Sequence, residues 1–170
     1  DKLIKKKGSI VTDATLQQIN KIRNISIKNN LNLNLIFNKD KGIKLISHRF
    51  LNDKQVFKIK LNNRNHKIET RLIGKIQLKN ILMAILAAKQ SGIKIEKIIK
   101  VIHRIKPVEG RLEKIGKIKN YSRVILDYAH TPAALELTLL NLKEQFPSSK
   151  ISLVFGCGGE RDFKKRSIMG

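Results

Sequence analysis

Two polar clusters follow apolar runs in the C-terminal third of the chain, and their residue types suit the binding of a nucleotide. The first cluster, residues 127–132 (DYAHTP), lies between the apolar run 123–126 and a helical pattern that begins at Thr131. A carboxylate and an imidazole at the carboxyl end of a strand can hold a ribose or align a phosphate. They can equally be a turn cap (Asp127) and a solvated loop residue (His130), and the residues alone favour neither interpretation.

The second cluster, residues 156–162 (GCGGERD), follows the apolar run 151–155. Glycines at this place let the backbone approach a ligand, and free N–H groups can bind an anion. Arg161 adds a planar fork that suits a carboxylate or a phosphate. A glycine cluster is as often only a tight turn, and no Gly-Lys-Ser/Thr follows to make it a phosphate loop of the Walker type.

Other residues with reactive side chains have simpler explanations. Cys157 is the single cysteine, no base is placed beside it, and a small buried filler is the alternative to a nucleophile. Lys164, Lys165 and Arg166 form either a phosphate clamp or the exposed first turn of a helix. The remaining histidines show no pair at metal-ligand spacing, so we expect structural or solvated roles for them: His48, His66 and His103.

Strands and helices of an α/β protein must position these clusters. Apolar and alternating runs predict strands near residues 9–12, 33–37, 43–50, 55–61 and 67–73. Helical spacing predicts helices over 16–27, with Asp13 as a possible cap, from Gly74 to Gly92, and over 95–105, before Pro107.

The loop that holds Gly110-Arg111 is the expected boundary between two domains. Beyond it we expect a strand at 123–126, a helix from Thr131 to about Phe146, and a strand at 151–155. Such a β-α-β unit implies parallel strands with a right-handed crossover, and both polar clusters would lie at the carboxyl ends of its strands.

Composition limits the classes of protein to which the chain can belong. Of 170 residues, 41% are hydrophobic and 29% are charged, which is typical of a soluble globular protein. The net charge of +23 suggests a nucleic-acid-binding module, but the cations are spread among Ile and Asn and aromatic residues are only 5%. We therefore favour a solvated basic surface and expect no nucleic acid partner. No signal peptide or membrane-spanning run is found, so we expect a cytoplasmic protein that binds no membrane.

The order and spacing of several motifs resemble the Mur ligases, and most of all the ligases that add the third residue to UDP-N-acetylmuramoyl-L-alanyl-D-glutamate. The motifs are residues 110–113 (GRLE), 127–132, 155–162 (FGCGGERD), 165–166 and 169–170, with 74–80 upstream. The family has Phe where this chain has Ile76. Glu109, Phe163-Lys164 and Ser167 also depart from its pattern, but none of these changes removes a presumed ligand.

The resemblance implies roles for single residues. Asn80 matches an asparagine near the adenine, and Arg111, Asp127 and His130 match residues that hold the nucleotide. Arg161 matches an arginine that binds the incoming amino acid, and Lys165 is a possible phosphate contact. No catalytic residue and no metal ligand is assigned in this chain.

For the fold, the resemblance implies the C-terminal part of a central ATP-binding domain (residues 1–111), followed by the first β-α-β part of a Rossmann-like domain (residues 112–170). For the activity, it implies ATP-dependent amide-bond formation through an acyl phosphate, with Mg²⁺. The substrates would be UDP-MurNAc-dipeptide and meso-diaminopimelate or L-lysine, and the full-length enzyme would be a monomer. The family's phosphate loop and carbamylated lysine do not occur in the chain, so we expect the chain to be an internal fragment that is inactive alone. The alternatives are a related ligase such as folylpolyglutamate synthase and, in another class, a basic nucleic-acid-binding module.

Overall fold

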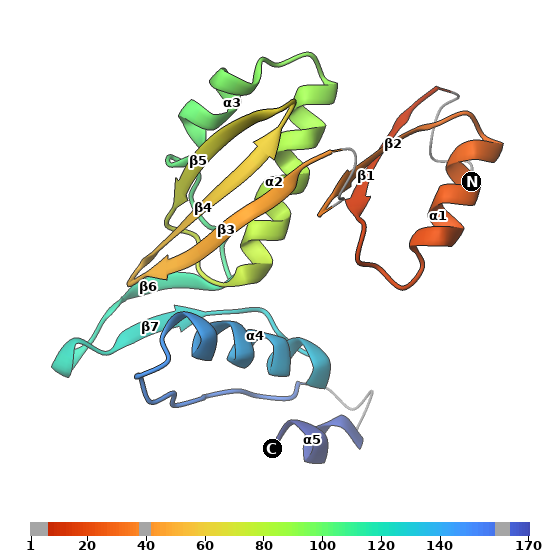
Figure 1. The fold of residues 1–170 in the computed structure, drawn as a ribbon. Coiled ribbons are helices and arrows are strands. Elements are labelled where there is room, and N and C mark those ends of the chain that lie inside the picture. The colour runs from red at the N-terminus through yellow and green to blue at the C-terminus, as the bar shows by residue number, and fades with distance from the viewer. Residues whose placement is uncertain (1–6, 38–41, 159–163) are drawn as a thin grey trace.

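A computed structural model of the chain describes residues 7–37, 42–158 and 164–170. The described part is an α/β protein, as predicted, with its helices and strands arranged in the order shown in Figure 1. The N-terminal part comprises the elements from β1 to α3 (residues 9–102), and the C-terminal part comprises those from β6 to α5 (residues 113–169). No helix of the described residues is long and apolar enough to cross a membrane.

The N-terminal part begins with two parallel strands, β1 (Ser9–Asp13) and β2 (Asn32–Ile36), which are joined by α1 (Ile19–Lys28). Asp13 does not cap this helix, whose N-cap is Gln18. The Asp13 carboxylate instead accepts hydrogen bonds from the backbone N–H and the hydroxyl of Thr15, both at 2.8 Å, and it pairs with Lys79 of α2. The Asp13 carboxylate is therefore engaged in a turn and in an ion pair. Helix α1 begins at Ile19, three residues later than expected.

Three antiparallel strands form the main sheet, in the order β3 (Lys44–Leu51), β4 (Lys54–Leu61), β5 (Arg64–Thr70). The alternation predicted for β4 is confirmed, because Phe57, Ile59 and Leu61 are buried whereas Lys58 and Lys60 are exposed. Strand β3 lies within one residue of its prediction at each end, and β5 begins and ends three residues earlier than the predicted 67–73. The β4–β5 hairpin turns at Asn62 and Asn63, which have φ values of 50° and 60°. Two left-handed residues match the twist of a tight hairpin, and asparagine tolerates them better than most residues.

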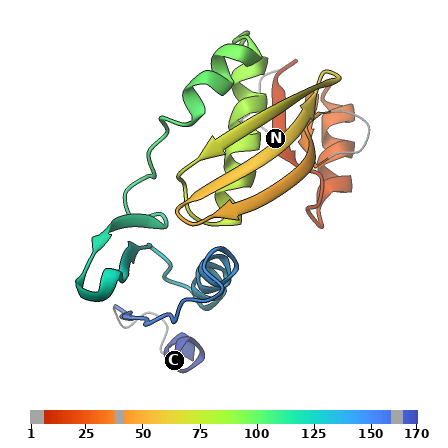
Figure 2. The same ribbon diagram turned by 60° about the vertical axis from the view of Figure 1, so that its left-hand side comes forward.

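Two helices cover one face of this sheet, α2 (Lys75–Gln90) and α3 (Ile95–Ile102), as Figures 1 and 2 show from two sides. The core lies between the two layers, with Phe57, Leu78 and Leu82 fully buried. Helix α3 ends at Ile102, one turn before the predicted end at Ile105. The sheet and these helices therefore share one hydrophobic core.

The C-terminal part contains one strand that was not predicted and lacks one that was. Strand β6 (Glu113–Lys117) pairs antiparallel with β7 (Arg123–Leu126), and the 3-10 turn η1 (Lys119–Tyr121) lies between them. Helices α4 (Pro132–Gln145) and α5 (Lys164–Met169) follow β7. Residues 151–155 are exposed and form no strand. A strand satisfies its backbone only beside a partner, and within the described residues none pairs with this segment. The expected parallel β-α-β pairing is thus not formed here.

Candidate functional site

Asp127 organises the loops at the end of β7. Its carboxylate accepts hydrogen bonds from the backbone N–H groups of Leu112 (2.8 Å) and Ala129 (3.0 Å) and from the hydroxyl of Thr138 (3.0 Å) on α4. The carboxylate therefore ties together the loop before β6, the loop after β7 and helix α4. In this state Asp127 acts as a support for the site, and its oxygens are already engaged by three donors.

Arg111 and His130 both lie next to the ring of Tyr128. The Arg111 guanidinium lies 5.3 Å from the centroid of the Tyr128 ring, and the His130 imidazole lies 5.2 Å from the same ring. Gly110 accepts a hydrogen bond from the Tyr128 backbone N–H at 2.7 Å, which holds the two loops in register. All three side chains are exposed, so a cation, an imidazole and an aromatic face are offered to solvent at one place.

Thr131 begins α4 directly after this cluster. Its hydroxyl accepts a hydrogen bond from the Ala134 N–H at 3.2 Å, and Pro132 occupies the first turn, which confirms the predicted helix start. The local sequence thus fixes where the helix begins, and thereby where His130 lies.

Asn80 lies on the other part of the chain, in an apolar groove between α2 and α3. The groove has a volume of about 580 Å³ and runs from Gln77 and Asn80 to Pro107 and Val108. The Asn80 amide donates a hydrogen bond to the side chain of Gln77 at 3.1 Å. These two amide groups are polar members of a groove lined mainly by apolar side chains. The structure therefore brings Arg111, Asp127 and His130 together, and it places Asn80 in a groove that is also lined by Pro107 and Val108, shortly before Gly110 in the chain.

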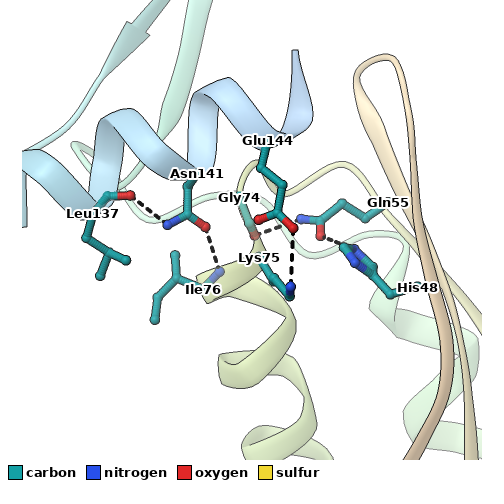
Figure 3. Close-up of polar contacts among 8 residues, drawn as sticks. All are labelled: His48, Gln55, Gly74, Lys75, Ile76, Leu137, Asn141 and Glu144. Atoms are coloured by element: carbon teal, nitrogen blue, oxygen red, sulfur yellow. Dashed lines mark hydrogen bonds and ion pairs between the residues drawn. The ribbon is translucent and has the colours of Figure 1, made fainter. Parts of the chain in front are cut away.

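The N-terminus of α2 is capped by side chains from α4 (Figure 3). The Gly74 N–H donates to the Gln145 side chain at 2.8 Å and the Ile76 N–H donates to the Asn141 side chain at 3.0 Å. Helix N-termini leave such donors without partners inside the helix. Asn141 and Gln145 are 5% and 4% exposed, so both caps are buried, and both come from a helix that is distant in the sequence. Sequence reasoning missed both residues, although Gly74 offers no side chain to cap its own helix.

A buried glutamine supports the same junction from the sheet side. The fully buried Gln55 amide donates to the backbone carbonyls of Leu72 (2.6 Å) and Gly74 (2.9 Å), and its oxygen contacts His48 at 2.8 Å. His48, one of the histidines expected to be structural or solvated, therefore lies in this network (Figure 3).

An ion-pair bridge closes the junction at its edge. Asp53, in the turn between β3 and β4, pairs with Lys114 of β6 and accepts a hydrogen bond from Arg123 of β7 at 2.7 Å. The hydrogen bond from Lys114 lowers the pKa of Asp53, against a smaller opposing effect of burial. The two parts of the chain are thus joined by charge at the rim and by amide hydrogen bonds inside.

The remaining predicted residues lie apart from this cluster or outside the description. Arg161 lies outside the described residues. Lys165 is half-buried on α5, and nothing described connects it with Arg111 or His130. Cys157 is half-buried, with its sulfur 3.7 Å from that of Met169. In the described residues no group of three His, Cys, Asp or Glu side chains could hold a metal ion.

Cations dominate the open face of the three-stranded sheet. Lys44 lies opposite Lys60 and Lys58 lies opposite Lys67 in the strand registers, and all four are exposed. Like charges directly opposite each other destabilise a sheet slightly. This face is the nearest approach in the structure to the contiguous basic surface that a nucleic-acid-binding module would need.

Sequence comparisons identify relatives of much of the chain. Residues 110–170 match the family described as Mur ligase, glutamate ligase domain. A protein of Rickettsia felis named UDP-N-acetylmuramoyl-L-alanyl-D-glutamate–2,6-diaminopimelate ligase is 44% identical over 110 residues, which are 64% of this chain and 20% of that protein. The chain thus spans about a fifth of the length of this relative.

Structural comparisons support the fold. A structure titled as UDP-N-acetylmuramoyl-L-alanyl-D-glutamate–2,6-diaminopimelate ligase matches 95% of this chain and 34% of its own, with a TM-score of 0.66 and 22% identity. A ligase from Thermotoga maritima, titled as MurF in complex with ADP, matches 82% of this chain and 31% of its own, with a TM-score of 0.64 and 15% identity. At these identities the likeness is one of fold alone.

Proposed function

We propose that the chain belongs to the Mur ligase family, whose glutamate ligase domain residues 110–170 match, and that it is part of an ATP-dependent ligase that adds the third amino acid to UDP-MurNAc-L-Ala-D-Glu. One observation carries the nucleotide-binding part of this proposal. Arg111, Asp127 and His130, which are far apart in sequence from Asn80, gather at the end of β7 beside the loop that leads from the Asn80 groove.

The geometry supports a division of roles in nucleotide binding. The apolar groove suits the flat face of an adenine, and the Asn80 amide at its edge offers both a donor and an acceptor. Exposed Arg111 is a planar cation that suits a phosphate, and exposed His130 can donate to a phosphate or a ribose oxygen. For Asp127 to bind a ribose, it would have to exchange at least one of its three present donors.

The chemistry proposed for the whole enzyme begins with phosphorylation of the D-glutamyl carboxylate by ATP, which gives an acyl phosphate and releases ADP. The amine of meso-diaminopimelate or L-lysine then attacks the acyl carbon and loses a proton, and inorganic phosphate leaves. Arg161 is proposed to anchor the carboxylate of that amino acid, and Lys165 to contact phosphate. Mg²⁺ would neutralise phosphate charge, and no residue of this chain is proposed as its ligand.

We further propose the boundary after Arg111 as the division between a central ATP-binding domain and a C-terminal ligase domain. The change from the α2–α3 layer to the β6–β7 hairpin falls at this place. The buried caps between α2 and α4 make the two domains pack tightly in this state.

Titration with ADP, followed by NMR of the labelled chain, tests the nucleotide site. We expect shifts at the Asn80 side-chain amide and at the backbone of 110–112 and 127–130. Pyrophosphate at matched ionic strength is the control, because a chain of charge +23 attracts any polyanion. Shifts that pyrophosphate reproduces in full, or that are confined to the lysines of β4, would refute the site.

The activity itself is tested in the full-length protein that contains this segment. We expect ADP release that depends on both UDP-MurNAc-L-Ala-D-Glu and the third amino acid. Arg161→Ala should impair use of the amino acid by about 30- to 1,000-fold, because a charge-assisted pair of about 2–4 kcal/mol is lost, while use of ATP changes little. An effect confined to the Michaelis constant for ATP would overturn the role of Arg161.

A further inference from the structure

Helix α4 contacts both halves of the proposed nucleotide site through one face. Thr138, Asn141 and Gln145 are spaced at i, i+3 and i+7, and residues at this spacing lie on the same side of a helix. At one end of that face, the Thr138 hydroxyl donates to the carboxylate of Asp127. At the other end, Asn141 and Gln145 accept hydrogen bonds from the first turn of α2.

The α2 end of this connection leads directly to Asn80. Asn141 binds the backbone N–H of Ile76, and Ile76 and Asn80 are four residues apart, one helical turn. The Gln145 amide also donates to the carbonyl of Asn52 at 3.2 Å, so the end of α4 is held by the β3–β4 turn as well as by α2. Helix α4 thus contacts Asp127 directly through Thr138, and through Asn141 it contacts α2 one turn before Asn80.

The contacts are buried and directional, which distinguishes them from the exposed ion pair beside them. Asn141 is held on both sides, because its N–H₂ donates to the Leu137 carbonyl at 2.7 Å while its oxygen accepts from Ile76. The neighbouring pair of Lys75 and Glu144, at 3.2 Å, joins side chains that are 53% and 45% exposed. Exposed pairs of this kind contribute little, whereas a buried N–H left without an acceptor is costly.

We propose that α4 is a rigid strut that sets the orientation of the Arg111–Asp127–His130 cluster relative to Asn80, with Asn141 and Gln145 as positioning residues. This inference rests on the proposed function for its consequence in binding, but the geometry of the strut can be tested without any ligand. The distance between α4 and the sheet measures whether the contacts to α2 fix α4, and ADP binding measures whether the position of α4 matters to the cluster.

Distances between spin labels test the strut in the whole 170-residue chain. With Cys157 changed to Ser, labels are attached to cysteines introduced at exposed Lys67 on β5 and exposed Glu136 on α4. We expect one narrow distance distribution, and a broadened or shifted one after N141L combined with Q145L. Glu144→Gln is the matched control from the same helical turn and should leave the distribution unchanged.

Conservative variants separate positioning from simple loss of folding. N141D and Q145E keep the oxygens that accept from Ile76 and Gly74 but lose the donors to Leu137 and Asn52, so they should broaden the distribution less than N141L/Q145L does. Far-ultraviolet circular dichroism of every variant checks that the helices persist. An unchanged distribution in the N141L/Q145L double variant, or equal broadening in the acceptor-keeping variants, would overturn the strut.

Nucleotide binding provides the second measurement. The double variant should weaken ADP binding by about 5- to 150-fold, the range usual for coupled sites, although neither residue contacts the proposed ligand. T138V should weaken ADP binding without changing the label distance, because it breaks the other end of the strut. If the unmodified chain binds no ADP, the proposed function fails, while the label distances still decide whether α4 sets the orientation.

Discussion

Replacing Gly74 by alanine tests the junction between the two parts of the chain most directly. Gly74 has φ 87° and ψ 144°, a conformation almost confined to glycine. A Cβ atom here would lie 2.8 Å from Cδ1 of Leu112 and 3.1 Å from Oδ1 of Asn141. The substitution therefore combines backbone strain with a clash against the C-terminal part.

The two effects can be given approximate sizes. A non-glycine residue in such a backbone region costs about 1–3 kcal/mol, and overpacking a buried contact costs about 1–3 kcal/mol more. The clashing atom of Leu112 is the end of a side chain and can move slightly, so we expect Gly74→Ala to reduce the free energy of unfolding by about 2–4 kcal/mol.

Urea unfolding of three alanine variants separates the two effects. Gly92 has a similar φ of 84° but no atom within 4 Å of a new Cβ, so Gly92→Ala should show the strain alone, about 1–2 kcal/mol. Gly116 has neither feature, and Gly116→Ala should change stability least. Equal losses for Gly74→Ala and Gly92→Ala would show that Leu112 and Asn141 do not pack on Gly74, and the described junction would be wrong.

Further predictions concern charge, capping and chain flexibility. Asp53 has a lowered pKa, chiefly through Lys114, so its ionised form stabilises the folded chain above its unfolded pKa of about 3.9. This stabilisation is lost as pH falls through the lower folded pKa; urea midpoints between pH 2 and 6 should show it, and Asp53→Asn should remove that part of the pH dependence. Thr131→Ala should cost about 0.5–2 kcal/mol in urea unfolding, and Thr131→Ser much less, since serine keeps the cap; equal losses would contradict the cap. Binding to duplex DNA should be non-specific and fall steeply between 50 and 200 mM salt as counterion release weakens, and K58Q/K60Q should reduce the salt slope; sequence-specific binding that survives the higher salt would favour the nucleic-acid alternative. Trypsin should cut first at exposed Arg104 or Arg111 in the segment between α3 and β6, and early cleavage within α2 instead would contradict the domain boundary.

Local chemistry made part of the fold predictable. The alternation of Phe57, Ile59 and Leu61 with lysines gave β4, and Thr131 with Pro132 gave the start of α4, because in both cases the signal lies within a few residues. Strand β6 was missed because residues 113–117 contain two lysines, a glutamate and a glycine. They form a strand only because β7 offers a partner, which is information that a local pattern does not contain.

The residues proposed for the candidate site could be chosen from the sequence, but the contacts that hold them in place could not. Arg111, Asp127 and His130 were selected by resemblance, and the structure gathers them around Tyr128. The three donors on Asp127 and the burial of Asn141 and Gln145 depend on how α4 docks, which no single segment encodes. The signal that could have indicated them is a polar stripe at i, i+3 and i+7 on a helix, together with a neighbouring helix that begins at glycine.

The exposed segment 151–155 has a consequence for the behaviour of the chain at high concentration. Its apolar side chains face water, Val154 almost completely at 98% exposure, and within the described residues no strand pairs with it. Such an extended apolar segment can pair with the same segment of another molecule. The net charge of +23 opposes that encounter by mutual repulsion, and salt screens the repulsion. Added salt should therefore promote precipitation of the chain, and Val154→Lys should raise the salt concentration at which turbidity begins.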